Sequence, residues 1–239
     1  KIDIITLFPE MCESFLSESI IGRARKSGHI DIECHQLRDF AFDKHRRVDD
    51  TPYGGGMGML MKAEPIALCF EEICKKNGTR PHLVYMSPKG QTLTQKKVKE
   101  LAQYDNICIL CGHYEGVDQR VLDEYVDEEI SIGDYVLTGG ELPALVLADS
   151  ISRMKDGVLS DALCFEEESH YSGLLESPQY TKPQVWHDKA VPEVLISGHH
   201  ENVRKWRRLQ SLLITKELRP DMYEKIELTK EDIKLLKNT

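Results

Sequence analysis

The segment from which the fold can be inferred reads Ser131-Ile132-Gly133-Asp134-Tyr135-Val136-Leu137-Thr138-Gly139-Gly140-Glu141-Leu142-Pro143. Its glycines allow positive φ angles and a close approach of the backbone to a ligand. Pro143 suits the first turn of a helix, where its missing N–H is not needed, and we expect an apolar helix over residues 142–153. This pattern indicates a ligand-binding loop, although an ordinary strand-to-helix turn can share it.

Two other apolar segments end in a similar way. The predicted strand 81–87 leads into Ser87-Pro88-Lys89-Gly90, and the predicted strand 106–111 leads into Gly112-His113-Tyr114-Glu115-Gly116. A third strand, 126–132, leads into the segment quoted above. Ligands of open parallel sheets lie outside the carboxyl ends of the strands. The three loops together therefore predict one small-molecule site.

The rest of the N-terminal part alternates strands and helices, which indicates an α/β fold with a parallel sheet. Strands are predicted over residues 2–8 and 30–37, where β-branched and apolar residues dominate. A helix is expected from the first strand to about Lys26, and others are expected over 64–75, 94–104 and 118–124. Residues 38–61 lack periodicity, and so long a loop is typical of a substrate-gripping segment, with a solvated loop as the alternative.

The loops do not match a phosphate-binding dinucleotide site. No G-x-G-x-x-G follows the first strand, and no G-x-x-x-x-G-K-[ST] occurs anywhere in the chain. Backbone groups, small residues and apolar side chains suit a neutral purine ring better than a pyrophosphate. This argues against a nicotinamide-dependent dehydrogenase.

Length and composition indicate a globular protein. The chain has 239 residues, of which 41% are hydrophobic and 30% charged. No apolar run approaches the roughly 20 residues that span a bilayer, and no signal peptide precedes Lys1, so we expect a cytoplasmic protein with no membrane partner. Seven irregularly spaced cysteines are expected to be reduced thiols, and no zinc-binding pattern completes the C-x-x-C of Cys108 and Cys111. No metal site is predicted.

Charge is unevenly distributed along the chain. The net charge is −9, but residues 176–239 hold 12 Lys+Arg against 10 Asp+Glu, and residues 1–175 hold 19 against 30. A polyanion would therefore prefer the C-terminal part. Its predicted helix, 202–218, begins with four cations in five residues, for which a charged outer face is the alternative interpretation. Thr229 and Asp232 predict the start of a last helix that ends near Lys237.

Regular patterning is lost between residues 154 and 173, which indicates a linker. We therefore expect a ligand-binding domain over 1–158, a flexible linker over 159–175 and a small helical domain over 176–239.

Several segments together resemble the bacterial tRNA (guanine-N1)-methyltransferases of the SPOUT superfamily. The resemblance covers essentially the whole chain in order, and its blocks are residues 49–59, 87–90, 111–116, 131–143, 178–183 and 197–201. It implies an α/β, SPOUT-type parallel sheet with a deep trefoil knot in the C-terminal part of the first domain, a feature that general topology rules would not favour. It also implies a homodimer with active sites at the subunit interface.

The resemblance further implies a bent S-adenosyl-L-methionine bound by the knot loops, with S-adenosyl-L-homocysteine as the product. The positions implied for the cofactor are Tyr85, Ser87, Pro88, Gly112, Tyr114, Glu115, Ile132, Gly133, Asp134, Tyr135, Val136, Leu137, Gly139, Gly140 and Pro143. They fall in the three loops described above.

The implied reaction is methylation of N1 of guanosine 37 in tRNA. N1 carries a proton at neutral pH, so a general base must lie within hydrogen-bond reach. The family has an aspartate before a serine in the linker, and here Glu168 precedes Ser169. Glu167 is the alternative base, and assistance by Mg²⁺ or water is open. Arg153 matches the arginine that stabilises charge on O6, and a simple helix-terminal cation is the alternative.

The implied tRNA contacts are His45, Arg46, Asp49, Asp50, His199, His200, Arg204, Lys205 and Arg207. Two other functions remain open at this point. One is a related SPOUT methyltransferase that acts on ribosomal RNA or on a ribose hydroxyl, and the other is a non-catalytic RNA-binding protein. In each case the expected partner is RNA and not DNA.

Overall fold

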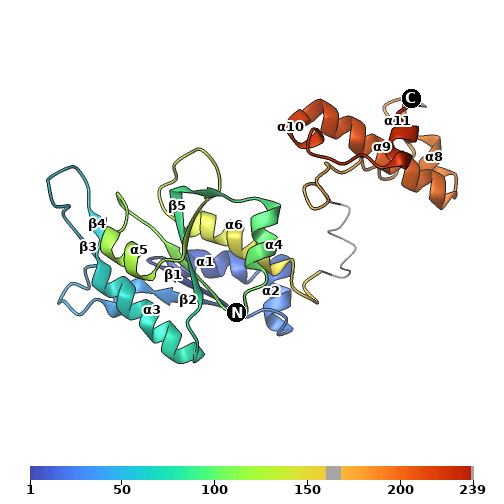
Figure 1. Cartoon of the computed structure of the whole chain (residues 1–239). Coiled ribbons are helices and arrows are strands. Elements are labelled where there is room, and N and C mark those ends of the chain that lie inside the picture. The colour runs from blue at the N-terminus through green and yellow to red at the C-terminus, as the bar shows by residue number, and fades with distance from the viewer. Residues whose placement is uncertain (160–167, 238–239) are drawn as a thin grey trace. The chain divides into compact units, whose positions relative to one another are not determined.

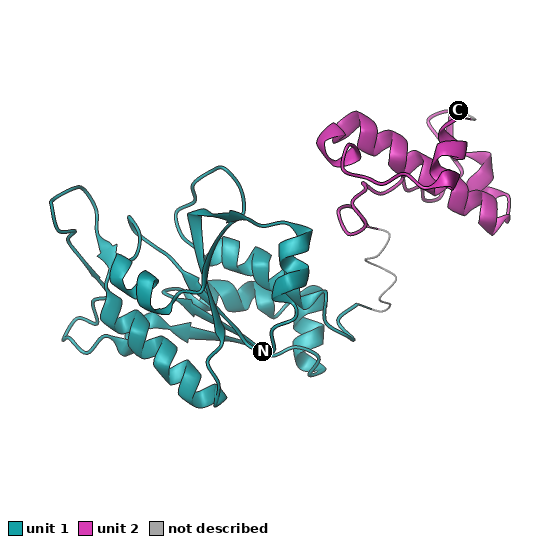
Figure 2. Cartoon of the chain, viewed as in Figure 1, with its two compact units in different colours: residues 1–160 teal, residues 161–239 magenta. Residues whose placement is uncertain are grey.

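The chain forms two compact units, residues 1–160 and residues 161–239 (Figure 2). The computed structural model describes residues 1–159 and 168–237, so the alternative base Glu167 lies outside the described residues. The first unit contains β1 (Ile2–Thr6), α1 (Pro9–Leu16), α2 (Ser19–Lys26), β2 (Ile32–Gln36), the 3₁₀ helix η1 (Leu37–Phe40), β3 (Asp49–Asp50), β4 (Leu60–Met61), α3 (Ala63–Asn77), β5 (His82–Thr92), α4 (Gln95–Leu101), β6 (Ile107–Cys111), α5 (Gln119–Tyr125), β7 (Glu128–Ser131) and α6 (Glu141–Ser152).

A five-stranded sheet in the order β2-β1-β6-β5-β7 forms the centre of this unit, and all its strand pairs are parallel (Figure 1). Ile4 of β1 lies opposite Cys34 of β2 on one side and Ile109 of β6 on the other. All residues of β1 and β6 are buried. Continuous apolar runs are typical of strands covered on both faces, and the predicted α/β fold with a parallel sheet is confirmed.

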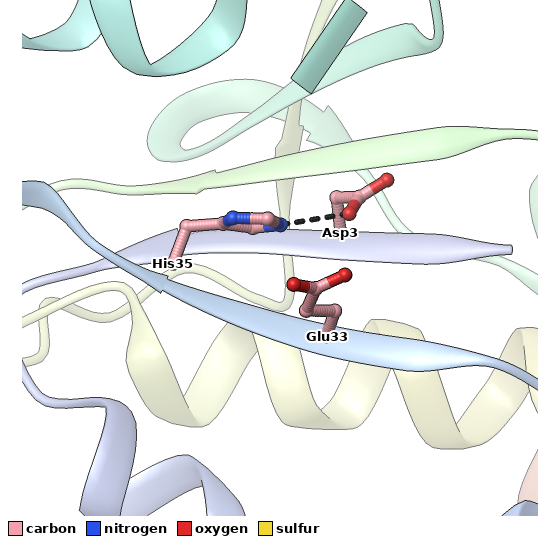
Figure 3. Close-up of side chains that lie close together, drawn as sticks. All are labelled: Asp3, Glu33 and His35. Atoms are coloured by element: carbon pink, nitrogen blue, oxygen red, sulfur yellow. Dashed lines mark hydrogen bonds and ion pairs between the residues drawn. The ribbon is translucent and has the colours of Figure 1, made fainter. Parts of the chain in front are cut away.

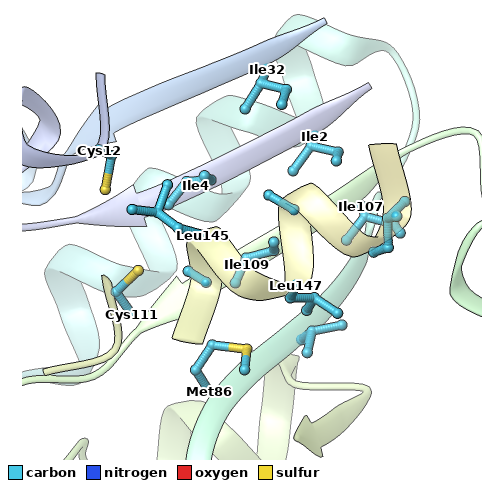
Figure 4. Close-up of a cluster of buried hydrophobic side chains, with 14 of the residues drawn as sticks. Ile2, Ile4, Cys12, Ile32, Met86, Ile107, Ile109, Cys111, Leu145 and Leu147 are labelled. Atoms are coloured by element: carbon cyan, nitrogen blue, oxygen red, sulfur yellow. The ribbon is translucent and has the colours of Figure 1, made fainter. Parts of the chain in front are cut away.

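Helices cover both faces of the sheet, because successive side chains of a strand point to opposite sides. Ile4 belongs to the core under α1, α2, α4 and α6 (Figure 4), and its neighbour Ile5 belongs to the core under η1, α3 and α5. Of the described cysteines, all are free thiols and most are buried. Burial raises the pKa of Cys108 and Cys111, which favours the neutral thiol.

Two predicted boundaries in this unit are wrong. The predicted single helix to Lys26 is interrupted at Ser17 and Glu18, where the chain turns back. A Cβ on Gly22 would lie 2.1 Å from the carbonyl oxygen of Ser17, so the turn between the two helices leaves no space for a side chain at this glycine. β5 does not end at Ser87 but continues to Thr92. Residues 87–90 bulge out of the strand, because Met86 and Gln91 both pair with the same residue of β7.

A polar network lies on β1 and β2, on the face toward α3 (Figure 3). Oδ1 of the fully buried Asp3 lies 2.7 Å from Nε2 of His35, and Glu33 binds the ammonium groups of Lys1 and Lys76. The ion pair with Lys76 holds the pKa of Glu33 below its ordinary value. Asp3, Glu33 and His35 offer three potential metal ligands within 4.8 Å of one another. Protein donors already bind them, which fits a structural network that ties α3 to the sheet.

The second unit is built around one long helix. Its described elements are β8 (Val185–Trp186), β9 (Lys189–Ala190), α8 (Glu193–Ile196), α9 (His200–Leu218), α10 (Pro220–Tyr223) and α11 (Lys230–Lys237). The shorter helices α8, α10 and α11 each contact α9. Thr229 Oγ1 accepts the N–H of Asp232, and Oδ2 of Asp232 accepts the N–H of Thr229, so the predicted cap of α11 is confirmed.

Every helix in the described ranges 1–159 and 168–237 is too short or too polar to cross a membrane.

Candidate cofactor site and active-site residues

A cavity of about 330 Å³ opens at the carboxyl edge of the sheet, which is the edge that the three predicted loops share. The bulge of β5, the loop after β6 and the loop after β7 line it. Its volume lies at the lower end of the range of ligand pockets. Because the loops follow β5, β6 and β7, the cavity occupies the place where open parallel sheets bind ligands.

Close packing of two glycine segments forms the floor of the cavity. The N–H of Gly140 donates a 2.7 Å hydrogen bond to the carbonyl of Gly112, and His113 forms an isolated antiparallel bridge with Gly139. A Cβ on Gly140 would lie 2.7 Å from the backbone nitrogen of Gly112. The segment after β7 therefore runs directly against the segment after β6, and only glycine fits there.

A buried hydrogen bond holds this segment to the sheet. The hydroxyl of Thr6 donates to Oε1 of Glu141 at 2.9 Å, and it also accepts the N–H of Phe8 at 2.9 Å. Glu141 is only 4% exposed and begins α6. A carboxylate in the first turn is favoured by the helix dipole. The cavity loop thus enters α6 at a point fixed to the end of β1.

Two tyrosines in the lining have perturbed environments. Burial, with a smaller contribution from Glu129, raises the pKa of Tyr85 to about 12, so its phenol remains a hydrogen-bond donor at neutral pH. Tyr114 has a φ of 58°, a left-handed conformation that costs energy for a non-glycine residue. Such strain often accompanies binding sites, because the surrounding structure must hold it.

Every residue implied for the cofactor except Asp134 lines this one cavity. Those that line it are Tyr85, Ser87, Pro88, Gly112, Tyr114, Glu115, Ile132, Gly133, Tyr135, Val136, Leu137, Gly139, Gly140 and Pro143. Asp134 lies in the same loop but not in the lining.

Several lining residues were not predicted from the sequence, among them Lys89, His113 and Thr138. Nδ1 of His113 is buried and, among the residues that the structure describes, has no hydrogen-bond partner. Lys89, His113 and Thr138 lie within the three predicted loops, each directly beside a residue that was predicted to bind the cofactor. Their position in the sequence could therefore have identified them.

The lining fits an adenosyl sulfonium compound. Gly112, Gly139 and Gly140 bring backbone groups into the lining, and the loop offers apolar side chains such as Leu137. Glu115 is the one Asp or Glu, and Lys89 the one Lys or Arg, among the described residues of the lining. A pyrophosphate would meet few donors here.

The predicted substrate loop is joined to the cavity loop. The N–H of Glu115 donates to the carbonyl of Met59 at 3.0 Å, and a Cβ on Gly58 would clash with the Glu115 side chain. Asp49 and Asp50 form β3, which pairs with β4, so the segment predicted as irregular contains a short hairpin. The loop that carries His45 is organised by Asp43, whose Oδ1 accepts the His45 N–H at 2.7 Å.

The two predicted catalytic residues belong to different units. Arg153 directly follows α6, and it lowers the pKa of Asp149, which burial raises by a larger amount. Glu168 lies in the second unit, in a bend before the turn at Ser169. Their functional roles stay predictions.

The cations of α9 have carboxylate partners. Arg204 binds Glu201 at 2.9 Å and Glu231 at 3.0 Å, and Lys205 lies 3.2 Å from Glu201. The hydrogen bonds from Arg204 and Lys205 lower the pKa of Glu201 to about 2. Of the other implied tRNA contacts in this unit, His199 and His200 are exposed at the start of α9.

The fold and the cavity define an α/β protein with a nucleoside-sized site at the carboxyl edge of a parallel sheet. Residues 1–225 match the family model "tRNA (Guanine-1)-methyltransferase TrmD". The chain therefore belongs to the tRNA (guanine-N1)-methyltransferase family, and the predicted resemblance is confirmed.

Relatives from three bacteria bear the name tRNA (guanine-N(1)-)-methyltransferase. The one from Clostridium perfringens (strain SM101 / Type A) is 54% identical over 238 residues, which is 100% of this chain and 99% of the relative. The one from Desulforamulus reducens is 52% identical over 99% of this chain and 93% of its own. The one from Ruminiclostridium cellulolyticum is 51% identical over 95% of this chain and 97% of its own.

Proposed function

We propose that this protein transfers the methyl group of S-adenosyl-L-methionine to N1 of guanosine 37 in tRNA. The observation that carries the proposal is the cavity itself, because fourteen of the fifteen positions implied for the cofactor converge on it from three separate loops. Full-length similarity to proteins named tRNA (guanine-N(1)-)-methyltransferase supports methyl transfer to N1 of guanine.

The cofactor, when bound, supplies an electrophilic methyl group and leaves as S-adenosyl-L-homocysteine. The chain's own residues would hold it: Gly112, Gly139 and Gly140 offer backbone groups in the lining, and Tyr85 offers a buried phenol as donor. Glu115 is the one Asp or Glu among the described residues of the lining, and its negative charge would complement a cationic ligand. These cavity residues are compatible with a dependence on Mg²⁺, for which we assign no protein site.

Proton removal and charge stabilisation are the other requirements of the reaction. Glu168 accepts the N1 proton of guanine, which frees the N1 lone pair. The guanidinium of Arg153 donates to O6, where negative charge grows as the proton leaves. Neither role needs a protein nucleophile, so positioning of the guanine accounts for the remaining part of the rate enhancement.

We assign tRNA binding to two exposed segments. One is the loop that contains His45, Arg46 and Asp49–Asp50, which is joined to the cavity through Met59 and Glu115. The other is the start of α9, where the implied contacts are His199, His200, Arg204, Lys205 and Arg207. Cations that contact phosphates position an RNA, and contacts to base edges give specificity.

The proposal includes the knotted topology and the homodimer of the family. The close passage of Gly140 against Gly112 supports a chain that returns past the loop after β6. Exposed apolar side chains on the neighbouring helices α1 and α6, including Met11, Phe15 and Val146, support a subunit interface on that face. A cytoplasmic site of action follows from a tRNA substrate.

The proposed function is tested with two tRNA transcripts that differ only in G or A at position 37. Labelled methyl transfer is measured, the product is digested to nucleosides, and Glu168→Gln is assayed in parallel. We expect 1-methylguanosine with the G transcript only, and a loss of about 10²–10⁴-fold in the variant, the usual range for a general base. Full activity of the variant would show that another group is the base, and equal methyl transfer to the A transcript would overturn guanosine 37 as the substrate.

A further inference from the structure

Among the Phe, Tyr and Trp side chains that the structure describes in the second unit, the most exposed lies on the β8–β9 hairpin. Residues 181–190 are all exposed, and within them Trp186 is 61% exposed. The ring of His187 stacks on the indole with centroids 4.2 Å apart and an interplanar angle of 27°. Much aromatic surface is therefore held in a fixed orientation without being buried by the described residues.

The backbone of the hairpin is held in an unfavourable conformation. His187 and Asp188 form its turn with φ angles of 47° and 62°, values typical of glycine or asparagine. Non-glycine residues in this region carry strain, which persists where a turn has a function. The strained turn places His187 against Trp186.

Cations accompany the aromatic pair on the hairpin. Trp186 lies directly opposite Lys189 in the antiparallel register, so both side chains share one face. Lys182 precedes β8. Unlike Arg204 and Lys205, neither Lys182 nor Lys189 forms an ion pair with any residue that the structure describes.

We propose that the face of the β8–β9 hairpin with Trp186 and Lys189 is a stacking platform for an unpaired nucleobase of the RNA substrate. The inference rests on the proposed function, and it names where and how the second unit grips RNA. Proteins bind unpaired bases by stacking them on aromatic rings beside cations that contact phosphates. A protein partner fits less well, because lysine is depleted from the cores of protein interfaces.

The chain contains two tryptophans, Trp186 and Trp206, which permits a direct test. In a Trp206→Phe variant all tryptophan emission comes from Trp186. This variant is titrated with the G37 transcript, while filter binding measures RNA affinity independently. We expect the emission to be quenched, with a midpoint at the dissociation constant from filter binding. Unchanged emission at saturating RNA would overturn the proposal.

Substitutions provide a second measurement. Trp186→Ala is expected to weaken tRNA binding about tenfold, within the range for loss of one base–aromatic stack. Trp186→Phe should lose less than about threefold, because a ring remains. Val185→Ala, on the opposite face of the hairpin, is the matched control and should bind as the unsubstituted protein does. Equal affinity of Trp186→Ala would also overturn the proposal.

The same experiments separate this inference from the proposed function. Methyl transfer without quenching would reject the platform alone, and quenching without methyl transfer would reject the reaction alone. Emission of Trp186 that changes with protein concentration in the absence of RNA would show that a second copy of the chain covers the face, which overturns the platform.

Discussion

Thr6 and Glu141 lie 135 positions apart in the chain, and the hydroxyl of Thr6 donates a 2.9 Å hydrogen bond to Oε1 of Glu141. Both residues are buried. The bond joins the last residue of β1 to the first residue of α6, immediately after the cavity loop. We therefore expect it to couple the stability of the first unit to the geometry of the cavity.

Thr6→Val should weaken both stability and cofactor binding, because it leaves a buried carboxylate oxygen without its donor. The expected loss of unfolding free energy is about 1–3 kcal/mol, measured by urea denaturation, together with a higher dissociation constant for S-adenosyl-L-methionine in calorimetry. Thr6→Ser keeps the hydroxyl and is the control. If the valine variant matched the serine variant in both measurements, the coupling would be wrong.

Gly140→Ala should abolish measurable cofactor binding. The added Cβ would lie 2.7 Å from the backbone nitrogen of Gly112 and 2.8 Å from the Cα of Cys111, and backbone atoms cannot move aside as a side-chain end can. Calorimetric titration of the variant with the cofactor is the measurement.

The control for this change is Gly78→Asn. Gly78 ends α3 with a φ of 68°, and a Cβ there has open space around it. Asparagine tolerates this left-handed conformation, so cofactor affinity should be unchanged. Normal affinity of Gly140→Ala would show that the loops can separate without cost to the site.

Much of the first unit could be predicted because its signals are local. The apolar runs of β1 and β6 indicate strands buried on both faces, and Thr94 caps α4 as expected by accepting the N–H of Lys97. Ligands lie at the carboxyl ends of parallel strands, and this rule predicted that three loops form one site. In the structure the three loops line one cavity.

The remaining features depend on contacts between distant segments. The bond between Thr6 and Glu141 has no local signature, and β5 extends past Pro88 only because β7 pairs with both sides of a bulge. Gly133 and Tyr135 line the cavity, but Asp134 between them does not. The geometry of the loop decides which side chains reach the cavity, and the sequence does not reveal it.

Arg208→Ala should destabilise the second unit in a pH-dependent way. Arg208 holds the buried carboxylate of Asp232 with bonds of 2.8 and 2.9 Å, and this lowers the pKa of Asp232 below its ordinary value of 3.8. A depressed carboxyl pKa gives stability that is present above about pH 4 and is lost as pH falls through the folded-state pKa. The loss at pH 7 should be about 2 kcal/mol and should shrink toward about pH 2.

Both tryptophans belong to the second unit, so their emission during urea denaturation at neutral, mildly acidic and strongly acidic pH measures this effect. Arg219→Ala removes the exposed ion pair with Asp221 and is the control, for which little change is expected. A difference between Arg208→Ala and the unsubstituted protein that did not vary with pH would contradict the ion-pair explanation.

Arg153→Ala should lower kcat about 10²–10³-fold, the usual effect of removing a donor to developing negative charge. Cofactor affinity and unfolding free energy should change less than kcat, because the proposed role of Arg153 is to stabilise the transition state. Single-turnover methyl transfer and urea denaturation measure the two effects. Arg23→Ala, a change of another cation near a helix end, is the control. A stability loss with normal kcat would identify Arg153 as a structural helix-terminal cation.

Reversal of charge at Arg204 and Lys205 should weaken tRNA binding and lower its dependence on salt. Both cations bind Glu201, and Arg204 also binds Glu231, so in the proposed complex each would exchange a carboxylate for a phosphate. Removing one cation–phosphate interaction lowers the slope of log K against log salt by about 1. For the double variant Arg204→Glu, Lys205→Glu, the magnitude of this slope should therefore be lower by about 1–2.

Filter binding at roughly 50–200 mM salt, a range in which phosphate interactions dominate the change in affinity, measures this slope. Arg219→Glu is the matched control, since Arg219 is likewise exposed and paired with a carboxylate but lies outside the implied tRNA contacts. An unchanged slope in the double variant would mean that the α9 pairs persist in the complex.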